Sequence, residues 1–142
     1  MGQPVYILNG PNLNLLGQRE PEHYGTATLA DIEAMCAAET DIVFRQSNHE
    51  GELIDWLHEA RERASGVVVN PGGLTHTSIA LMDAAAVLDV PLVEVHLSQT
   101  AAREEFRHRS YIGRVATGTV TGLGPLGYVL AVKAIVSMGK RA

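Results

Sequence analysis

Hydrophobic residues of this chain fall into short runs rich in β-branched side chains, and each run is followed by a segment with helical periodicity. Five such runs occur, at Val5–Asn9, Ile42–Arg45, Val67–Asn70, Leu92–His96 and Ala116–Thr121. Nearly continuous apolar strands that alternate with helices are typical of a parallel sheet covered on both faces. The pattern therefore predicts an α/β fold.

Capping residues and apolar spacing predict where the helices begin and which faces they bury. Thr28 can cap the first helix, and the segment Ser47–Glu50 fits a capping box ahead of the second. Thr77 is expected to begin the third helix, residues 101–106 a short fourth, and Pro125 lies early in the fifth, where its missing N–H costs little. The apolar positions expected to be buried are Leu29, Ile32, Met35 and Cys36 in the first helix, Leu53, Ile54, Leu57 and Ala60 in the second, and Ile79, Leu81, Ala84, Ala85 and Leu88 in the third.

Length and composition fit one globular domain. Domains average about 150 residues, so the 142 residues of this chain leave no room for a second one. Hydrophobic residues make up 46% and charged residues 19%, the composition of a folded soluble protein. Together with the five strand–helix units, this favours a flavodoxin-like five-stranded parallel sheet with helices on both faces, for which the commonest strand order is 2-1-3-4-5.

Charge and cysteine content narrow the partners and the compartment. The net charge of −5 is spread along the chain, so no nucleic acid partner is expected. Cys36 is the single cysteine, which indicates a reducing compartment and favours a cytoplasmic location. The longest apolar stretches, Ile79–Val90 and Tyr128–Met138, contain charged residues and fall short of the ~20 apolar residues of a membrane span. No membrane partner is expected.

Polar residues gather where three of the predicted strands end. The first strand runs into Asn9–Asn12, the third into Asn70–His76, and the fourth ends in Glu94–Ser98. Ligands of open parallel sheets bind outside the carboxyl ends of the strands, so these segments are expected to share one crevice. Asn9, Gly10 and Thr77, taken singly, fit turns and caps. The side chains predicted to form a site together are Asn12, Asn70, His76, His96 and Ser98.

The connection between the first strand and its helix, residues 10–27, is longer than most βα loops and is interpreted as a lid. It carries Arg19 and Tyr24, with Gly17 and Gly25 as candidate hinges. A neighbouring guanidinium stabilises a phenolate, so these two side chains can form a base. The alternative is that Tyr24 covers the surface and Arg19 is a solvated charge.

On the fourth strand, Glu94, His96 and Ser98 alternate onto one face. A carboxylate beside an imidazole orients it and suits it to general acid catalysis. A structural ion pair is the alternative interpretation.

Two arginines follow the fourth strand, Arg103 and Arg107, one helical turn apart if this segment is a helix. Such a pair can clamp a substrate carboxylate. The alternative is that one of them pairs with the neighbouring Glu104 or Glu105.

Several kinds of site lack their signatures. Gly122–Gly127 spells G-x-G-x-x-G, but it closes the last unit and no acidic residue follows, so it is interpreted as close helix–sheet packing. The sequence has no P-loop, no nucleophile elbow and no metal-ligand spacing among its six histidines, so no metal is expected. The only lysines are Lys133 and Lys140, both late in the chain, which disfavours a Schiff base.

The chain resembles the type II 3-dehydroquinate dehydratases (type II dehydroquinases) over nearly its whole length and in the same order. The segments that carry the resemblance are Ile7–Asn14, Arg19–Pro21 with Tyr24 and Gly25, Gln46–Gly51, Asn70–Gly73 with Thr75–Ser78, Glu94–Ser98, Arg103–Arg107 and Gly122–Tyr128. The family's flavodoxin-like fold agrees with the fold predicted above. The segment 37–41 is shorter than is common in the family.

The resemblance implies an anti elimination of water from 3-dehydroquinate, giving 3-dehydroshikimate through an enolate, in the shikimate pathway or in quinate catabolism. Tyr24 would remove a C2 proton, and Arg19 would keep it ionised. Asn12 would hold a water at the enolate oxygen. His96, oriented by Glu94, would protonate the departing hydroxyl. No cofactor is implied.

The resemblance also implies the residues that bind substrate and the assembly. Arg103 would belong to the lid side, and Asp83 would reach the site of a neighbouring subunit, because the family forms trimers that assemble into dodecamers. The other binding residues would be Asn70, His76, Leu97, Ser98 and Arg107.

Two other functions are open on the residues alone. Clustering of Ser98 with His96 or His76 is compatible with a hydrolase, and the fold is compatible with a module that binds a small ligand or phosphate without turnover.

Overall fold

The computed structural model describes residues 2–18, 22 and 25–139. Within this part of the chain, five strands form one sheet in which every pair is parallel: β1 (Val5–Asn9), β2 (Ile42–Gln46), β3 (Gly66–Asn70), β4 (Leu92–His96) and β5 (Gly118–Thr121). Their order is β2-β1-β3-β4-β5, so the predicted flavodoxin-like topology is confirmed.

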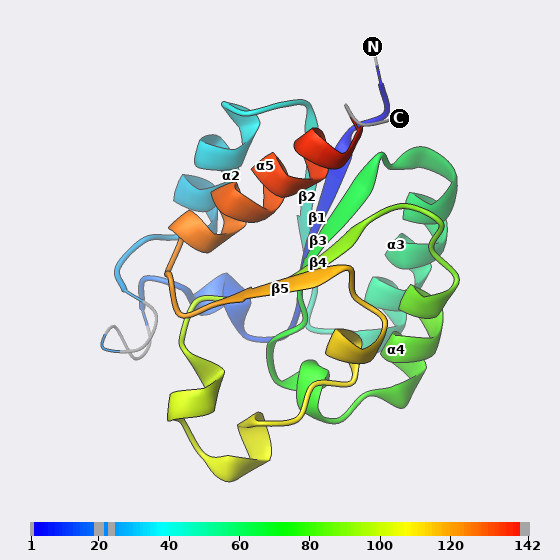
Figure 1. The fold of residues 1–142 in the computed structure, drawn as a ribbon. Coiled ribbons are helices and arrows are strands. Elements are labelled where there is room, and N and C mark those ends of the chain that lie inside the picture. Colours follow the sequence, from blue (N-terminus) through cyan, green and yellow to red (C-terminus); the bar gives the residue numbers. More distant parts are fainter. Residues whose placement is uncertain (1, 19–21, 23–24, 140–142) are drawn as a thin grey trace.

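Helices cover both faces of this sheet (Figure 1). On one face lie α2 (Leu29–Ala37) and α5 (Leu126–Gly139), and on the other lie α3 (Glu50–Arg63) and α4 (Ile79–Ala86). The connecting segments contain short 3-10 helices: η1 (Leu13–Leu15), η2 (Gly72–His76), η3 (Thr100–Ala102), η4 (Glu105–Arg107) and η5 (Ile112–Arg114).

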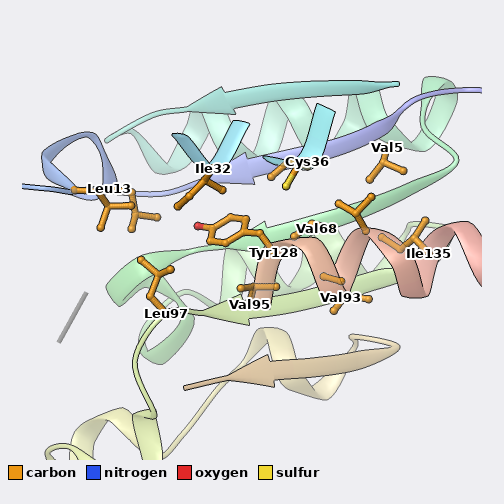
Figure 2. Close-up of a cluster of buried hydrophobic side chains, with 14 residues drawn as sticks. Val5, Leu13, Ile32, Cys36, Val68, Val93, Val95, Leu97, Tyr128 and Ile135 are labelled. Atoms are coloured by element: carbon orange, nitrogen blue, oxygen red, sulfur yellow. The ribbon is translucent and has the colours of Figure 1, made fainter. Parts of the chain in front are cut away.

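The sheet divides the core into two layers because side chains alternate along each strand. In β1, Val5 and Ile7 pack on the side of α2 and α5, whereas Tyr6 and Leu8 pack on the side of α3 and α4. The first layer, shown in Figure 2, also holds Tyr128, which lies among aliphatic side chains of the sheet and of α2. Both faces of the central strands are therefore buried, as their continuous apolar sequences predict.

Cys36 lies in this first layer and is fully buried. Burial, reinforced by the charge of Glu39, raises the pKa of its thiol to about 11. The thiol therefore stays protonated near neutral pH and acts as a small apolar core residue.

One predicted helix start is confirmed and two are wrong. Thr28 caps α2 in a full capping box with Asp31. Ser47, by contrast, accepts a hydrogen bond from the N–H of His49, which is itself the N-cap of α3, so the predicted capping box does not form. The third helix is capped by Ser78, whose hydroxyl accepts from Leu81 N–H, one residue after the predicted start. Adjacent hydroxyls in this sequence cannot be distinguished by pattern alone.

The predicted helix at residues 101–106 is also wrong. The segment forms two 3-10 turns, η3 and η4, and Arg103 lies between them in an extended conformation. Its one large apolar side chain, Phe106, is 64% exposed, so no apolar stripe stabilises an α-helix here.

Two predicted core positions differ as well, and so do three strand boundaries: β2 ends one residue later, β3 begins one residue earlier and β5 begins two residues later than predicted. Met35 and Ile79 are 38% and 54% exposed, at the edges of helix faces whose central residues are buried. The fifth strand begins at Gly118 because η5 occupies the preceding residues, and Ala116 closes that turn through a hydrogen bond to the Ile112 carbonyl.

Candidate active site

The carboxyl ends of β1, β3 and β4 open into one cleft, as the parallel topology predicts. Its volume is about 150 Å³, and its walls come from the loop after β1, from η2, and from the segment that carries η3 and η4. These loops gather at one end of the molecule in Figure 1, beyond the arrowheads of the strands. The cleft is therefore built by residues that lie far apart in the sequence.

Two glycines allow the loops after β1 and β3 to touch. Gly10 N–H donates to the Asn70 carbonyl at 2.8 Å, and a Cβ at Gly10 would lie 2.4 Å from the Pro71 carbonyl oxygen. Gly72 has a φ of +61°, and a Cβ there would lie 3.0 Å from the Pro11 oxygen. Larger residues at either position would push the two loops apart, so these glycines allow the close contact between the loops after β1 and β3.

Asn12 adopts a left-handed backbone conformation with a φ of 71°, the single non-glycine residue among those described to do so. Its N–H donates to Asn48 Oδ1 at 2.9 Å, and the same oxygen accepts a 3.1 Å bond from Gln46 Nε2. Asparagine tolerates this backbone region better than most residues. The loop after β2 therefore fixes Asn12 at the mouth of the cleft.

Glu94 and His96 form a buried pair on β4. Glu94 Oε2 and His96 Nε2 are 2.6 Å apart, and the two residues are 1% and 7% exposed. Burial by itself raises the pKa of Glu94, but the hydrogen bond and charge of His96 and two neighbouring hydroxyls outweigh it and hold that pKa below its usual range. The arrangement joins an ionised carboxylate to an imidazole that lines the cleft.

The two hydroxyls belong to Thr75 and Ser110. Thr75 Oγ1 donates to Glu94 Oε2 at 2.6 Å, and Ser110 Oγ lies 2.9 Å from both carboxylate oxygens. The Glu94 carboxylate thus accepts hydrogen bonds from Thr75, Ser110 and His96.

His76, in η2, stacks against His96 with ring centroids 6.3 Å apart and an interplanar angle of 16°. Burial, together with the positive charges of His96 and Arg107, lowers the pKa of His76, although its bond to a backbone carbonyl opposes this. The ring is therefore neutral near pH 7. Its Nδ1 lies 2.7 Å from the Arg109 carbonyl and must carry the hydrogen, which leaves Nε2 as an acceptor.

Asn70 uses both ends of its amide within the protein. Its Nδ2 donates to the hydroxyl of Tyr128 at 2.8 Å, and its Oδ1 accepts from Gly72 N–H at 3.1 Å. Each end retains further hydrogen-bonding capacity, so a fixed amide faces the cleft.

Two guanidinium groups line the far wall of the cleft. Arg103 donates to Ser98 Oγ at 3.1 Å, and Arg107 Nε lies 3.0 Å from Glu104 Oε1. Arg103 Nε is 3.7 Å from the same carboxylate oxygen. Both arginines, and not only one, therefore pair with Glu104, and both line the cleft. Their binding of a substrate carboxylate stays a prediction.

Most of the residues predicted from the sequence meet in this cleft. The eight that line it are Asn12, Asn70, His76, His96, Leu97, Ser98, Arg103 and Arg107. Glu94 lies behind them and touches His96. Asp83 is exposed on α4 and is not among the lining residues. Arg19 and Tyr24 lie outside the described residues.

The sequence analysis assigned no role to four residues that support the site. Asn48 accepts hydrogen bonds from Asn12 and Gln46, and Thr75 and Ser110 donate to Glu94. Gln46 ends β2, and Asn48 and Thr75 lie in the segments that follow strands, so their positions offered a signal. Ser110 lies between two 3-10 helices and follows no strand, so no pattern pointed to it.

Other features of the sequence also have a structural outcome. A Cβ at Gly127 would lie 3.3 Å from Val120 Cγ1, so this glycine of the motif allows close helix–sheet packing as predicted, whereas Gly122 and Gly124 have positive φ angles and lie in the preceding turn. Among the described residues, no group of three or more potential metal ligands occurs, and no helix is long and apolar enough to cross a membrane.

Comparison with known proteins agrees with this geometry. A family model described as "Dehydroquinase class II" matches residues 3–136. The 3-dehydroquinate dehydratase of Maricaulis maris is 59% identical over 98% of this chain and 99% of its own length, and that of Caulobacter vibrioides is 56% identical over 94% and 95%. The crystal structure of type II dehydroquinase from Propionibacterium acnes matches with a TM-score of 0.89 and 42% identity, covering 96% of this chain and 98% of that one.

Proposed function

The chain belongs to the dehydroquinase class II family, whose reaction is the dehydration of 3-dehydroquinate in the shikimate pathway, and from this premise we propose how its residues carry the reaction out. The family membership makes the chain a lyase and replaces both the hydrolase and the binding-module interpretations. The proposed mechanism is an anti elimination through an enolate, without a Schiff base. Its product is 3-dehydroshikimate.

The Glu94–His96 pair is the observation that carries the proposal. The carboxylate holds His96 Nε2 at 2.6 Å, so Nδ1 is the nitrogen left to act toward a substrate in the cleft. A protonated imidazole held in this way is the general acid: it gives its proton to the C1 hydroxyl as the C1–O bond breaks, and water leaves. Glu94 stabilises the imidazolium before this transfer.

Tyr24 is proposed as the base. Its phenolate takes the C2 proton, and the electron pair of the C–H bond moves toward the C3 carbonyl to form the enolate. A phenol with its ordinary pKa of about 10 is mostly protonated near neutral pH. Arg19 supplies the positive charge that favours the phenolate.

Asn12 is proposed to hold a water that donates a hydrogen bond to the enolate oxygen. Its fixed left-handed backbone and its bond to Asn48 support this, because stabilising developing charge requires donors that are in place before the reaction.

The substrate-binding groups are those that the family resemblance implies, and the charge and tautomers of the cleft support two of them. Arg107 pairs with the substrate carboxylate, and Arg103 supports the lid side. His76 Nε2 accepts from a substrate hydroxyl, because its Nδ1–H is committed to the Arg109 carbonyl. The groups proposed to bind the remaining hydroxyls are Asn70, Ser98 and the backbone of Leu97.

Trimers assembled into dodecamers are proposed for the oligomer, with Asp83 reaching the cleft of a neighbouring subunit. Its exposed position on α4 supports this role. A cytoplasmic location is proposed on the single buried cysteine.

Stereospecific labelling tests the elimination. Two samples of 3-dehydroquinate, each deuterated at one of the C2 positions, are converted, and the product is analysed by mass spectrometry. Anti elimination removes the deuterium on the face opposite the C1 hydroxyl and retains the other. The opposite pattern, or inactivation by borohydride in the presence of substrate, contradicts the proposed mechanism.

A further inference from the structure

The hydroxyl groups of Thr75 and Ser110 both reach the buried carboxylate of Glu94. Thr75 Oγ1 lies 2.6 Å from Glu94 Oε2, the oxygen that also contacts His96. Ser110 Oγ lies 2.9 Å from each oxygen of the same carboxylate. Thr75 comes from η2 and Ser110 from the segment between η4 and η5, so two separate loops converge on one side chain.

The direction of these hydrogen bonds is fixed by chemistry. An ionised carboxylate only accepts, so both hydroxyls donate to it. The N–H of Gly113 donates to Ser110 Oγ at 2.8 Å, which satisfies that oxygen as an acceptor and leaves the Ser110 hydroxyl hydrogen for Glu94. Glu94 therefore receives donors from Thr75, Ser110 and His96.

We propose that Thr75 and Ser110 are positioning residues that keep the Glu94 carboxylate ionised and aimed at His96. The inference rests on the roles proposed above for Glu94 and His96. Neither hydroxyl touches the reacting atoms; both act through the carboxylate.

The physical need for these hydroxyls comes from burial. Glu94 is 1% exposed, and a carboxylate taken from water without donors gains a proton rather than keep its charge. A neutral carboxyl group no longer stabilises an imidazolium and can rotate away from His96. The two hydroxyls thus replace the water that burial removes.

A second cavity of about 110 Å³ adjoins this network and is lined in part by Thr75, Glu94, His96 and Ser110. A substitution that shrinks a side chain next to this cavity can let a water molecule enter and replace the lost hydroxyl. A substitution that keeps the side-chain volume does not open that space. Thr75→Val is therefore the sharpest test, because valine keeps the shape of threonine and removes only the donor. Thr75→Ser is its matched control, because it keeps the donor and removes a methyl group.

Steady-state kinetics with 3-dehydroquinate give the first readout. Losing a hydrogen bond to a charged group predicts a fall in kcat of roughly 10- to 100-fold in Thr75→Val, with little change in KM. Thr75→Ser is expected to remain near the wild-type rate. Equal kcat values for the two variants would overturn the proposal.

The second readout does not depend on turnover. The carboxyl carbon of Glu94 is followed by ¹³C NMR in protein labelled at glutamate, with Glu94→Gln used for assignment. The pKa of Glu94 is expected to rise in Thr75→Val and in Ser110→Ala, and to stay unchanged in Thr75→Ser. An unchanged Glu94 titration in both of the first two variants would overturn the proposal.

These results also separate the inference from the proposed function. If replacing His96 leaves turnover intact, the proposed function fails, whatever the NMR titrations show. If replacing His96 abolishes turnover while Thr75→Val matches the wild type, only the positioning role fails. Thermal unfolding of each variant identifies losses that come from misfolding, and Ser110→Ala provides a second route if Thr75→Val does not fold.

Discussion

Asn70, at the carboxyl end of β3, donates a 2.8 Å hydrogen bond from Nδ2 to the hydroxyl of Tyr128 in α5. The same hydroxyl donates to Asn9 Oδ1 at the end of β1, at 2.7 Å. Burial raises the pKa of Tyr128 far above its usual range, so the hydroxyl keeps its hydrogen. Tyr128, labelled among the core side chains in Figure 2, therefore links the ends of two neighbouring strands.

Replacing this tyrosine is expected to affect both stability and binding. Tyr128→Phe leaves the buried amides of Asn70 and Asn9 each short of a partner, and about 2 kcal/mol of unfolding free energy is expected to be lost. KM is expected to rise because Asn70 is no longer fixed. Urea unfolding and steady-state kinetics measure the two effects.

Tyr6→Phe is the matched control for that variant. The Tyr6 hydroxyl bonds to Glu59 on the side of α3, away from the cleft, so KM should not change. A KM that rises equally in both variants would contradict the link between Tyr128 and the site.

The close contact of the loops after β1 and β3 makes Gly10 sensitive to any side chain. Gly10→Ala places a Cβ against the Pro71 carbonyl, where the ideal position is only 2.4 Å from its oxygen. A loss of about 1–3 kcal/mol of stability is expected from such overpacking. Gly73→Ala, where a Cβ meets nothing within 4 Å, is the control and should remain near wild type in urea unfolding.

Glu94 is expected to act on turnover more than on substrate affinity. Glu94→Gln keeps the shape but removes the charge that stabilises a protonated His96, so kcat is expected to fall by roughly 10²-fold. KM should change little, because Glu94 lies behind the residues that line the cleft. If Glu94→Gln instead raises KM and leaves kcat unchanged, Glu94 contributes to substrate binding, and the role proposed for it in catalysis is contradicted.

Acid is expected to destabilise the fold through His76 as well as through the carboxylates. The pKa of His76 is lowered in the folded protein, so below about pH 6.5 the unfolded chain binds more protons than the folded one. The stability that comes from keeping His76 neutral is fully present above that pH. It is lost as the pH falls toward the pKa that His76 has in the folded protein. His76→Gln should therefore show a smaller loss of stability than wild type when urea unfolding at neutral pH is compared with pH 5.5. If wild type and His76→Gln lose the same free energy of unfolding between the two pH values, the lowered pKa of His76 is contradicted.

The sequence predicted the sheet and most of the cleft because both depend on signals local to each strand. Apolar runs identified the strands, and the polar residues that follow them, such as Asn70 and His96, meet because parallel strands end at the same edge. The residues themselves suggested a base at Arg19 and Tyr24 and a general acid at His96, and the family resemblance supplied the reaction and the remaining roles; all of these roles remain predictions.

What the sequence did not predict depends on contacts between distant segments. Ser110 reaches Glu94 only because an irregular loop folds back over β4, and Tyr128 joins Asn9 and Asn70 across 119 and 58 residues. The segment around Arg103 was expected to be helical from a polar pattern that has no apolar face to bury. Met35 and Ile79 are exposed because apolar spacing marks a helix face but not its width.

The central claim is that His96 protonates the leaving hydroxyl of 3-dehydroquinate, and His96→Asn tests it most directly. The asparagine amide can still donate a hydrogen bond to Glu94, but it is not acidic enough to transfer a proton to the leaving hydroxyl. Formation of the conjugated enone is followed by ultraviolet absorbance. Wild type is expected to produce it steadily, also after borohydride treatment, whereas His96→Asn should be slower by roughly 10²- to 10⁴-fold. A folded His96→Asn protein that turns over at nearly the wild-type rate would contradict the account.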